Sequence, residues 1–165
     1  MKTKNIMIVG VGGQGTLLTS RVLGGIIQEA GYDVKLSEVH GMAQRGGSVV
    51  TFVRYGEKVF EPIVEDGVLI VNDQRMDPMT VVTGAMEYPE KILETLSERF
   101  KVVSVDAMAE AKKLGNARVF NTIIIGVAAK SMDFPKEQWL EVIEKTVPPK
   151  TIDINKEAFL TGYSI

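Results

Sequence analysis

Gly10-Val11-Gly12-Gly13-Gln14-Gly15 is the stretch that decides the fold of this chain. It fits the pattern GxGxxG, follows a short apolar run at residues 5–9, and precedes residues 17–30, where apolar side chains recur at helical spacing. A short apolar run that ends in glycine is typical of a strand buried in a parallel sheet. The spacing that follows predicts a helix, which Gly31 ends in a left-handed conformation. The order strand, glycine turn, helix is the start of a Rossmann-like fold.

The glycine turn is a candidate anion site. Glycines permit a tight turn and a close backbone approach, and the start of the helix at Thr16 offers free N–H groups and a partial positive charge to a phosphate or carboxylate. The glycines could equally serve only the packing of strand, turn and helix. In an NAD site, Glu38 would hold ribose hydroxyls, because it lies near the end of the second predicted strand, residues 33–39.

The rest of the pattern predicts a single α/β domain over residues 1–165. Residues 33–39 complete a βαβ unit with a right-handed crossover. Residues 48–55, a turn at 55–58 and a second β run predict an inserted β-hairpin. Further predicted strands cover residues 68–71 and 101–105, helices begin after Pro89 and Pro135, and residues 122–132 fit either a helix or a strand. Asp106, Asn121 and Asn155 are predicted N-caps. We expect a Rossmann-like, mainly parallel sheet with helices on both faces.

Composition excludes several classes of function. The 19 basic and 21 acidic side chains give a net charge of −2, which argues against nucleic-acid binding. Without cysteine the chain forms no disulfide and holds no iron–sulfur cluster through thiolates, and a lone histidine rules out a multi-histidine metal site. We expect no metal site. The chain shows neither a signal-peptide pattern nor 18 uninterrupted apolar residues, so we expect a cytoplasmic protein that does not contact a membrane.

A polar, glycine-rich stretch follows Glu38 and is the second candidate site. Residues 40–48 carry an imidazole, an amide, a guanidinium and a hydroxyl on a backbone that its glycines free to approach another surface. This composition indicates recognition of a ligand or a partner. A solvated loop is the alternative, and for His40 alone a structural hydrogen bond is the favoured interpretation. Arg45 is the strongest candidate because its planar fork suits phosphates and carboxylates.

Three longer stretches carry a family resemblance: GVGGQGTLLTSRVLG at 10–24, SEVHGMAQRGGSVVTFVRYG at 37–56 and VPPKTIDINKEAFLTG at 147–162. They resemble the beta subunits of indolepyruvate:ferredoxin oxidoreductases and the related gamma subunits or domains of pyruvate and other 2-oxoacid:ferredoxin oxidoreductases. NDQRMDP at 72–78 and GNARVFNT at 115–122 are weaker signals of the same kind. The second and third stretches favour the indolepyruvate branch.

The resemblance implies a small subunit that is inactive alone. Its larger alpha partner would bind thiamine diphosphate, Mg and iron–sulfur clusters, and the complex would decarboxylate arylpyruvates oxidatively with CoA and reduce ferredoxin. This chain would bind no cofactor firmly and supply no catalytic residue. The glycine turn would correspond to the phosphate turn, and the second candidate site would face the partner or CoA. The residues assigned to cofactor or partner contact are Gly10, Gly12, Gly13, Gln14, Gly15, Thr16, His40, Met42, Gln44, Arg45, Gly46, Gly47 and Ser48.

The chain departs from the family pattern at one place. Members of the family usually carry roughly one more strand and helix between the counterparts of Gly67 and Val68, judged by ordinary βα unit lengths, whereas here these residues are adjacent. This makes the strand order in the middle of the domain uncertain. Two other functions stay open: a self-sufficient NAD-dependent oxidoreductase that uses Glu38, and a nucleotide- or acyl-carrier-binding module without a catalytic partner.

Overall fold

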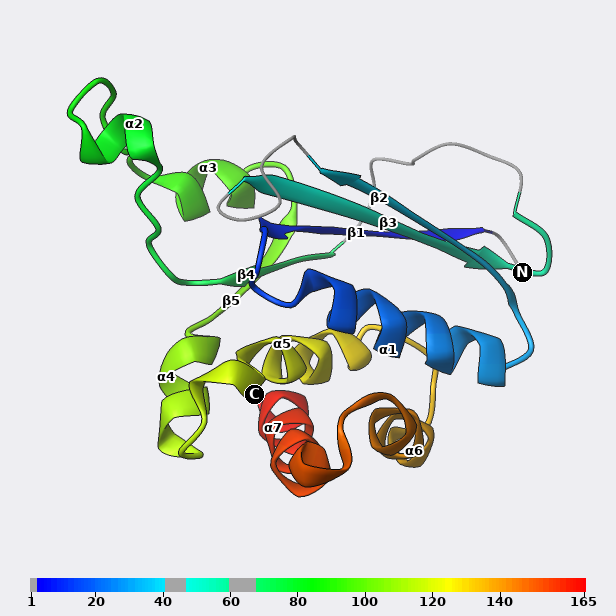
Figure 1. The fold of residues 1–165 in the computed structure, drawn as a ribbon. Coiled ribbons are helices and arrows are strands. Elements are labelled where there is room, and N and C mark those ends of the chain that lie inside the picture. The colour runs from blue at the N-terminus through cyan, green and yellow to red at the C-terminus, as the bar shows by residue number, and fades with distance from the viewer. Residues whose placement is uncertain (1–2, 41–46, 60–67) are drawn as a thin grey trace.

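The computed structural model describes residues 3–40, 47–59 and 68–165 (Figure 1). Its strands form two sheets. One has three strands in the order β1-β3-β2, and the other pairs β4 with β5 in parallel. The strands are β1 (Lys4–Val11), β2 (Asp33–His40), β3 (Ser48–Gly56), β4 (Val68–Asn72) and β5 (Lys101–Val105).

The three-stranded sheet corrects the predicted layout. The α/β class is confirmed, but β3 lies between β1 and β2 and runs antiparallel to both, so this sheet is antiparallel rather than mainly parallel. β1 and β2 are still parallel to one another, as a βαβ unit requires, although β3 separates them. The reason is that alternating apolar residues identify a strand without identifying its neighbours. The predicted second arm of the hairpin, after Lys58, falls mainly on residues 60–67, outside the described residues.

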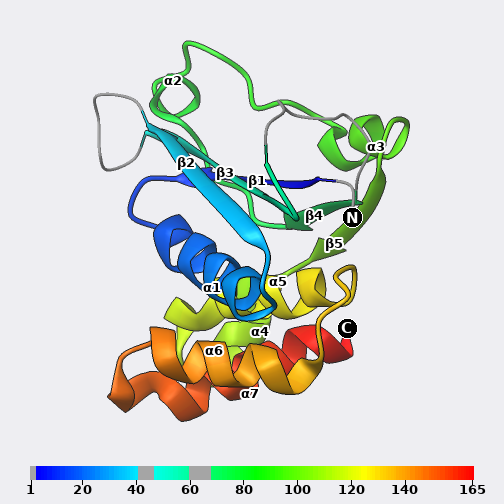
Figure 2. The same cartoon turned by 90° about the vertical axis from the view of Figure 1, so that its right-hand side faces the viewer.

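The helices are α1 (Thr16–Glu29), α2 (Met79–Val82), α3 (Ile92–Ser97), α4 (Ala107–Lys113), α5 (Phe120–Ala129), α6 (Lys136–Thr146) and α7 (Ile152–Ser164), with 3-10 turns at Ala117–Val119 and Pro149–Thr151. α1 packs on one face of the three-stranded sheet, α5 lies beside it against β4, and α6 and α7 form a further layer beyond them (Figures 1 and 2). α2 and α3 lie on the other side, where α3 packs against β5 of the two-stranded sheet. The prediction of helices on both faces is therefore wrong for this sheet, because a direct β2-to-β3 connection needs no crossover helix on the second face.

Local signals explain the start of α4 and the end of α1. The Asp106 carboxylate accepts the Ala109 N–H at 2.8 Å and caps α4, as predicted. Gly31 has a φ of 80°, which confirms the predicted stop after α1. Residues 122–132, which fitted either structure, fall largely in helix α5. The predicted caps at Asn121 and Asn155 are wrong, because these residues lie inside α5 and α7.

The core joins both sheets to the helical layer. One buried cluster contains Val53, Trp139 and Phe159, and a second contains Val105, Ile123 and Ala158. Helices α5 and α7 contribute to both clusters, so the two are packed around the same pair of helices. Helices α5 and α7 also cross closely. A Cβ atom added at Gly126 of α5 would lie 2.2 Å from the Phe159 carbonyl oxygen of α7.

Candidate functional site

The glycine turn joins β1 to α1 with a backbone that side chains rarely permit. Gly13 and Gly15 have φ values of 95° and 82°, in the left-handed region where glycine is favoured. Gly10 has no room for a side chain, since an added Cβ would lie 2.6 Å from Cγ2 of Thr16. The turn also contacts the residue that precedes β3, because the Gly12 N–H donates to the Gly47 carbonyl at 2.8 Å. These glycines are therefore structurally required.

Gln14 connects the turn to two distant parts of the chain. Its Oε1 accepts the Val11 N–H at 3.2 Å, and its Nε2 lies 2.8 Å from Sδ of Met76. The Gln14 carbonyl also accepts a hydrogen bond from Nδ2 of Asn121, at the start of α5. Gln14 thus fixes the turn against both α5 and the segment that follows β4.

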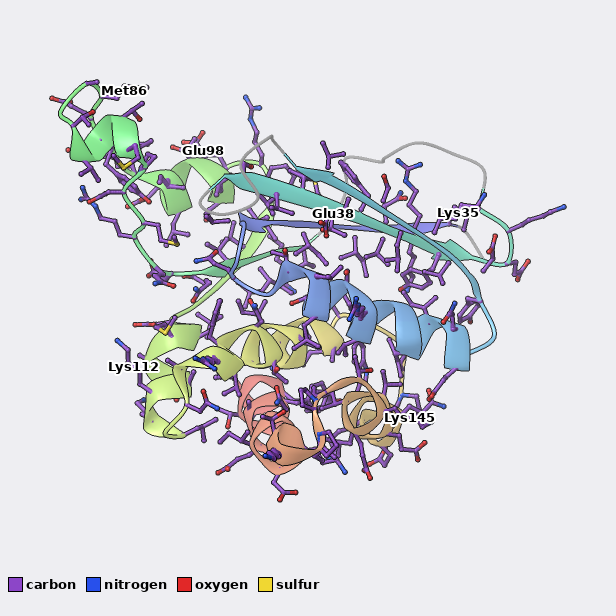
Figure 3. All side chains as sticks on the ribbon, in the orientation of Figure 1. Lys35, Glu38, Met86, Glu98, Lys112 and Lys145 are labelled. Carbon is purple, nitrogen blue, oxygen red and sulfur yellow. The ribbon has the colours of Figure 1, made fainter. Side chains whose placement is uncertain are left out.

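A pocket of about 400 Å³ opens beside the turn. Its lining consists of Gly12, Gly13, Gly15, Thr16, Leu17, Glu38 and Val49. Glu38 lies between the sheet and the first turn of α1 (Figure 3), and its Oε2 accepts the Thr51 hydroxyl at 3.5 Å. This volume is at the lower end of the range for small-molecule sites, about 300–1,000 Å³.

The pocket contains both backbone N–H groups that attract an anion and the carboxylate of Glu38. Within the described part of the chain, the N–H groups of Gly13, Gly15, Thr16 and Leu17 make no hydrogen bond, and the last two begin α1. Such N–H groups at a helix N-terminus attract an anion. The carboxylate of Glu38 lines the same pocket, so it repels an anion near itself and instead suits a hydroxyl or amine donor. The pocket is suited to a ligand with both an acidic and a hydroxyl or amino group.

The second candidate site begins and ends beside the turn. His40 is paired with Val49, and Val11 is paired with Ser48, so both ends of the intervening loop lie at the same end of the sheet as the turn. Gly47 and Ser48 are described and lie next to Gly12, whereas Met42, Gln44, Arg45 and Gly46 lie outside the described residues, as does the side chain of His40. The insertion of β3 between β1 and β2 is what brings the two sequence motifs together.

The candidate set omitted several residues of this site. Asn121 and Met76 contact Gln14, and Leu17 and Val49 line the pocket. Asn121 and Met76 lie within GNARVFNT and NDQRMDP, the two weaker stretches of the family resemblance, so that resemblance carried a usable signal. The sequence carried no such signal for Val49, because Val49 lines the pocket only as a result of the strand order.

Comparison with known families decides the relationship. The family "Pyruvate ferredoxin/flavodoxin oxidoreductase" matches residues 5–66 and 57–165. The chain belongs to this family. Indolepyruvate oxidoreductase subunit IorB of Thermococcus kodakarensis is 38% identical over 192 aligned residues, which cover 98% of this chain and 95% of that protein.

Solved structures of this oxidoreductase family confirm the fold. Pyruvate oxidoreductase subunit PORC of Thermotoga maritima superposes with a TM-score of 0.72 at 26% identity, over 99% of this chain and 97% of that one. The 2-oxoglutarate:ferredoxin oxidoreductase of Magnetococcus marinus, solved with 2-oxoglutarate, coenzyme A and succinyl-CoA, has a TM-score of 0.73 at 16% identity. The match covers 99% of this chain but 31% of that longer chain, so the same fold there forms one part of a larger body.

The family match also bears on the departure noted at residues 67 and 68. It falls into two segments that overlap at residues 57–66, and the alignment to IorB spans 192 positions, more than the 165 residues of this chain. The relative therefore contains positions that have no counterpart here. The break in the match falls where the sequence predicts an absent strand and helix, and where the two sheets of this structure are separate.

The described residues show no site for a metal ion or a thiolate-bound cluster. The sequence has no cysteine for an iron–sulfur cluster. Among residues 3–40, 47–59 and 68–165, no group of three or more His, Cys, Asp or Glu side chains is placed to hold a metal ion. No described helix is long and apolar enough to cross a membrane.

Proposed function

We propose that this chain is the small subunit of an indolepyruvate:ferredoxin oxidoreductase complex, as a single domain over residues 1–165. The observation that carries the proposal is 38% identity to an IorB subunit over nearly the full length of both chains. The complex oxidatively decarboxylates arylpyruvates, transfers the acyl group to CoA and passes the electrons to ferredoxin. The shared packing of α5 and α7 in both buried clusters supports a single domain.

Thiamine diphosphate, Mg and the iron–sulfur clusters belong to the larger alpha subunit under this proposal. The absence of cysteine supports that division of labour. Thiamine diphosphate supplies carbanion stabilisation and the clusters carry electrons, while the protein chains bind and orient the reactants. The role of this chain is to complete the complex and to shape one side of its reactant-binding surface.

The glycine turn and the loop after His40 form that side. N–H groups of the turn are available to a phosphate or carboxylate, and Glu38 is available to a hydroxyl or amine. CoA carries all of these groups except a carboxylate, so it is the reactant that best suits the pocket. We assign Gly10–Thr16 and residues 40–48 to contact with CoA or the larger subunit, and no residue of this chain to the bond-breaking steps.

Two alternatives make different predictions. A gamma subunit of a pyruvate or other 2-oxoacid enzyme would share the fold, but the identity to PORC is 26%, below the 38% to IorB. A self-sufficient NAD-dependent enzyme is favoured by the position of Glu38 in the glycine pocket, where an acid would bind ribose hydroxyls.

Reconstitution separates these functions. We expect this chain and the larger subunit from the same source, expressed together under anaerobic conditions, to reduce ferredoxin with indolepyruvate and CoA. Activity should fall at least about tenfold when either chain is omitted, because neither holds a complete site. Replacing indolepyruvate by pyruvate should lower kcat/KM, and the reverse order would favour the gamma-subunit function.

NADH titration of the isolated chain tests the remaining alternative. We expect no saturable binding at concentrations up to the millimolar range. Micromolar binding that Glu38→Gln weakens and Lys35→Gln leaves unchanged would contradict the proposed function, since Lys35 points to the opposite face of β2.

A further inference from the structure

The three-stranded sheet has an apolar face that points away from α1. Side chains alternate along each strand, and the apolar end of this face, here called the outer sheet face, consists of Met7, Val9, Val39, Val50 and Phe52. The other end of the same face carries Asn5, Lys35 and Arg54. Val50 lies between Val9 and Val39 in one cross-strand row, and Phe52 lies beside Met7 in the next. The exposed fractions are 57% for Met7, 62% for Val9 and 57% for Val39.

No described element covers the outer sheet face. Among residues 3–40, 47–59 and 68–165, α1 is the helix that packs on this sheet, and it lies on the opposite face (Figures 1 and 2). A solvated face of an antiparallel sheet is normally polar, with apolar residues confined to the packed face. Contiguous apolar rows on an exposed face mark an interaction surface.

A projecting arm rises on the same side of the sheet. Residues 73–91, which include α2, form this arm, and both views place α2 on the side away from α1 (Figures 1 and 2). α2 has no buried residue, and the arm exposes Met76, Met79, Val82 and Met86 by 41–71%. Figure 3 shows Met86 at the far end of the arm. Four exposed large apolar side chains on a segment with so little burial indicate that the arm packs on another surface.

The arm and the outer sheet face adjoin the glycine turn. Met76, at the base of the arm, contacts Gln14, and the row that ends in Val9 and Val39 lies at the end of the sheet where the turn begins. A body bound to both would therefore reach the end of the sheet where the glycine turn lies, while Glu38 and Val49 of the pocket face α1 on the other side of the sheet. On the described helical side, Leu160 and Ile165 are exposed by 39% and 51%, but most apolar side chains pack in the core of the chain.

We propose that the outer sheet face and the arm bind the larger subunit of the complex, through an uncharged apolar surface on that subunit. This inference rests on the proposed function. A larger subunit is a better occupant than a second copy, because the fold occurs in the 2-oxoglutarate enzyme as 31% of a longer chain, joined covalently to a larger body. In such an enzyme, the small domain packs one face on the larger part of the protein and the other face on its own helices.

Paired charge substitutions test the assignment. The test variant is Met7→Lys with Val9→Lys, and the matched control is Leu160→Lys with Ile165→Lys, which adds the same charge at residues exposed by 39% and 51% on the helical side. Binding of each purified chain to the immobilised larger subunit is measured by interferometry, with light scattering and thermal unfolding of the free chains. We expect at least about tenfold weaker binding for the test variant and a change below about twofold for the control.

Each outcome is decisive. Equal binding of the test variant and the unmodified chain overturns the surface assignment and leaves the proposed function standing. Absence of binding by the unmodified chain overturns both. A dimer of the free chain that the test variant dissociates assigns the face to a second copy and also overturns the inference. Should the lysine variant unfold, Met7→Gln with Val9→Thr replaces it, and a loss of binding below about twofold contradicts the inference.

Discussion

The two faces of the three-stranded sheet have opposite surroundings. Val53 and Tyr55 of β3, which point toward α1, are 0% and 1% exposed, whereas Val9, which points the other way, is 62% exposed. Both faces carry large apolar side chains in consecutive rows. For these apolar rows, the difference comes from which face the chain covers with its own helices. Apolar side chains of a subunit are buried either in its own core or in an interface of the complete assembly.

The covered side is held by contacts that leave little room for change. Helices α5 and α7 meet backbone to backbone at Gly126 and Gly162, and an Asn155 amide inside α7 accepts the Thr122 hydroxyl at 2.6 Å. Rings from Tyr55 through Phe134 to Trp139 continue the packing from the sheet to α6, with centroids 6.1 Å apart at each step. Substitutions here should destabilise the free chain, whereas substitutions on the outer sheet face should mainly weaken assembly.

The largest expected effect is that of Gly126→Ala. The added Cβ would lie 2.2 Å from the Phe159 oxygen and 2.7 Å from the Tyr163 nitrogen, which are backbone atoms that cannot rotate away. Forced separation of the helices outweighs the gain in helix propensity of about 1 kcal/mol, and we expect a loss of about 3 kcal/mol in the free energy of unfolding. Urea titration followed by circular dichroism measures it.

Gly24→Ala is the matched control for this substitution. Its Cβ would meet Cδ1 of Leu36 at 3.2 Å, the flexible end of a half-exposed side chain. The change in the free energy of unfolding should stay within about 1 kcal/mol. Equal losses for the two alanine variants would contradict the backbone crossing as the source of the difference.

The sequence predicted the local elements of the fold well because their causes are local. Residues nearby in the sequence determine each of these elements: the strand before Gly10, the end of α1 at Gly31 and the cap at Asp106. Asn155 was misinterpreted for the same reason: asparagine before an apolar segment is typical of an N-cap, but here Thr122 from another helix binds its side chain. Strand order, and with it the antiparallel β3, depends on pairings between distant segments that hydrophobic period does not encode.

In the candidate site, too, local features could be predicted from the sequence, whereas contacts between distant residues could not. The turn from Gly10 to Thr16 could be identified from its pattern, and its glycines have the predicted conformational role. The contacts of Gln14 with Met76 and Asn121 join residues 62 and 107 positions apart, so only the folded chain brings them together. Whether residues 40–48 bind a ligand stays a prediction, as does any ligand of the turn.

A smaller loss is expected for Thr122→Val. This substitution keeps the shape of the side chain and removes the hydroxyl that donates to Oδ1 of buried Asn155, leaving that acceptor without its partner. Loss of a buried hydrogen-bond donor costs about 1–2 kcal/mol. Thr161→Val is the control, because its hydroxyl bonds to the Glu157 carbonyl at an exposed position. Urea titrations that give the same midpoint for both variants would show that the Thr122 bond does not stabilise the covered side.

Tyr55 lies on the covered face of the sheet, and its ionisation tests that burial most specifically. At neutral pH, Tyr55→Phe should have the smallest effect on stability. Burial, with smaller contributions from the negative charges of Asp133 and Tyr32, raises the pKa of Tyr55 to about 12. An unfolded tyrosine ionises near pH 10, so between about pH 10 and 12 the folded state retains a proton that the unfolded state loses. The free energy of unfolding should therefore fall by about 1 kcal/mol between pH 9 and 11 relative to Tyr55→Phe, which has no proton to lose. Urea titrations of both proteins at each pH measure the difference, and parallel pH curves would mean that Tyr55 is as accessible to water as the side chains of the outer sheet face.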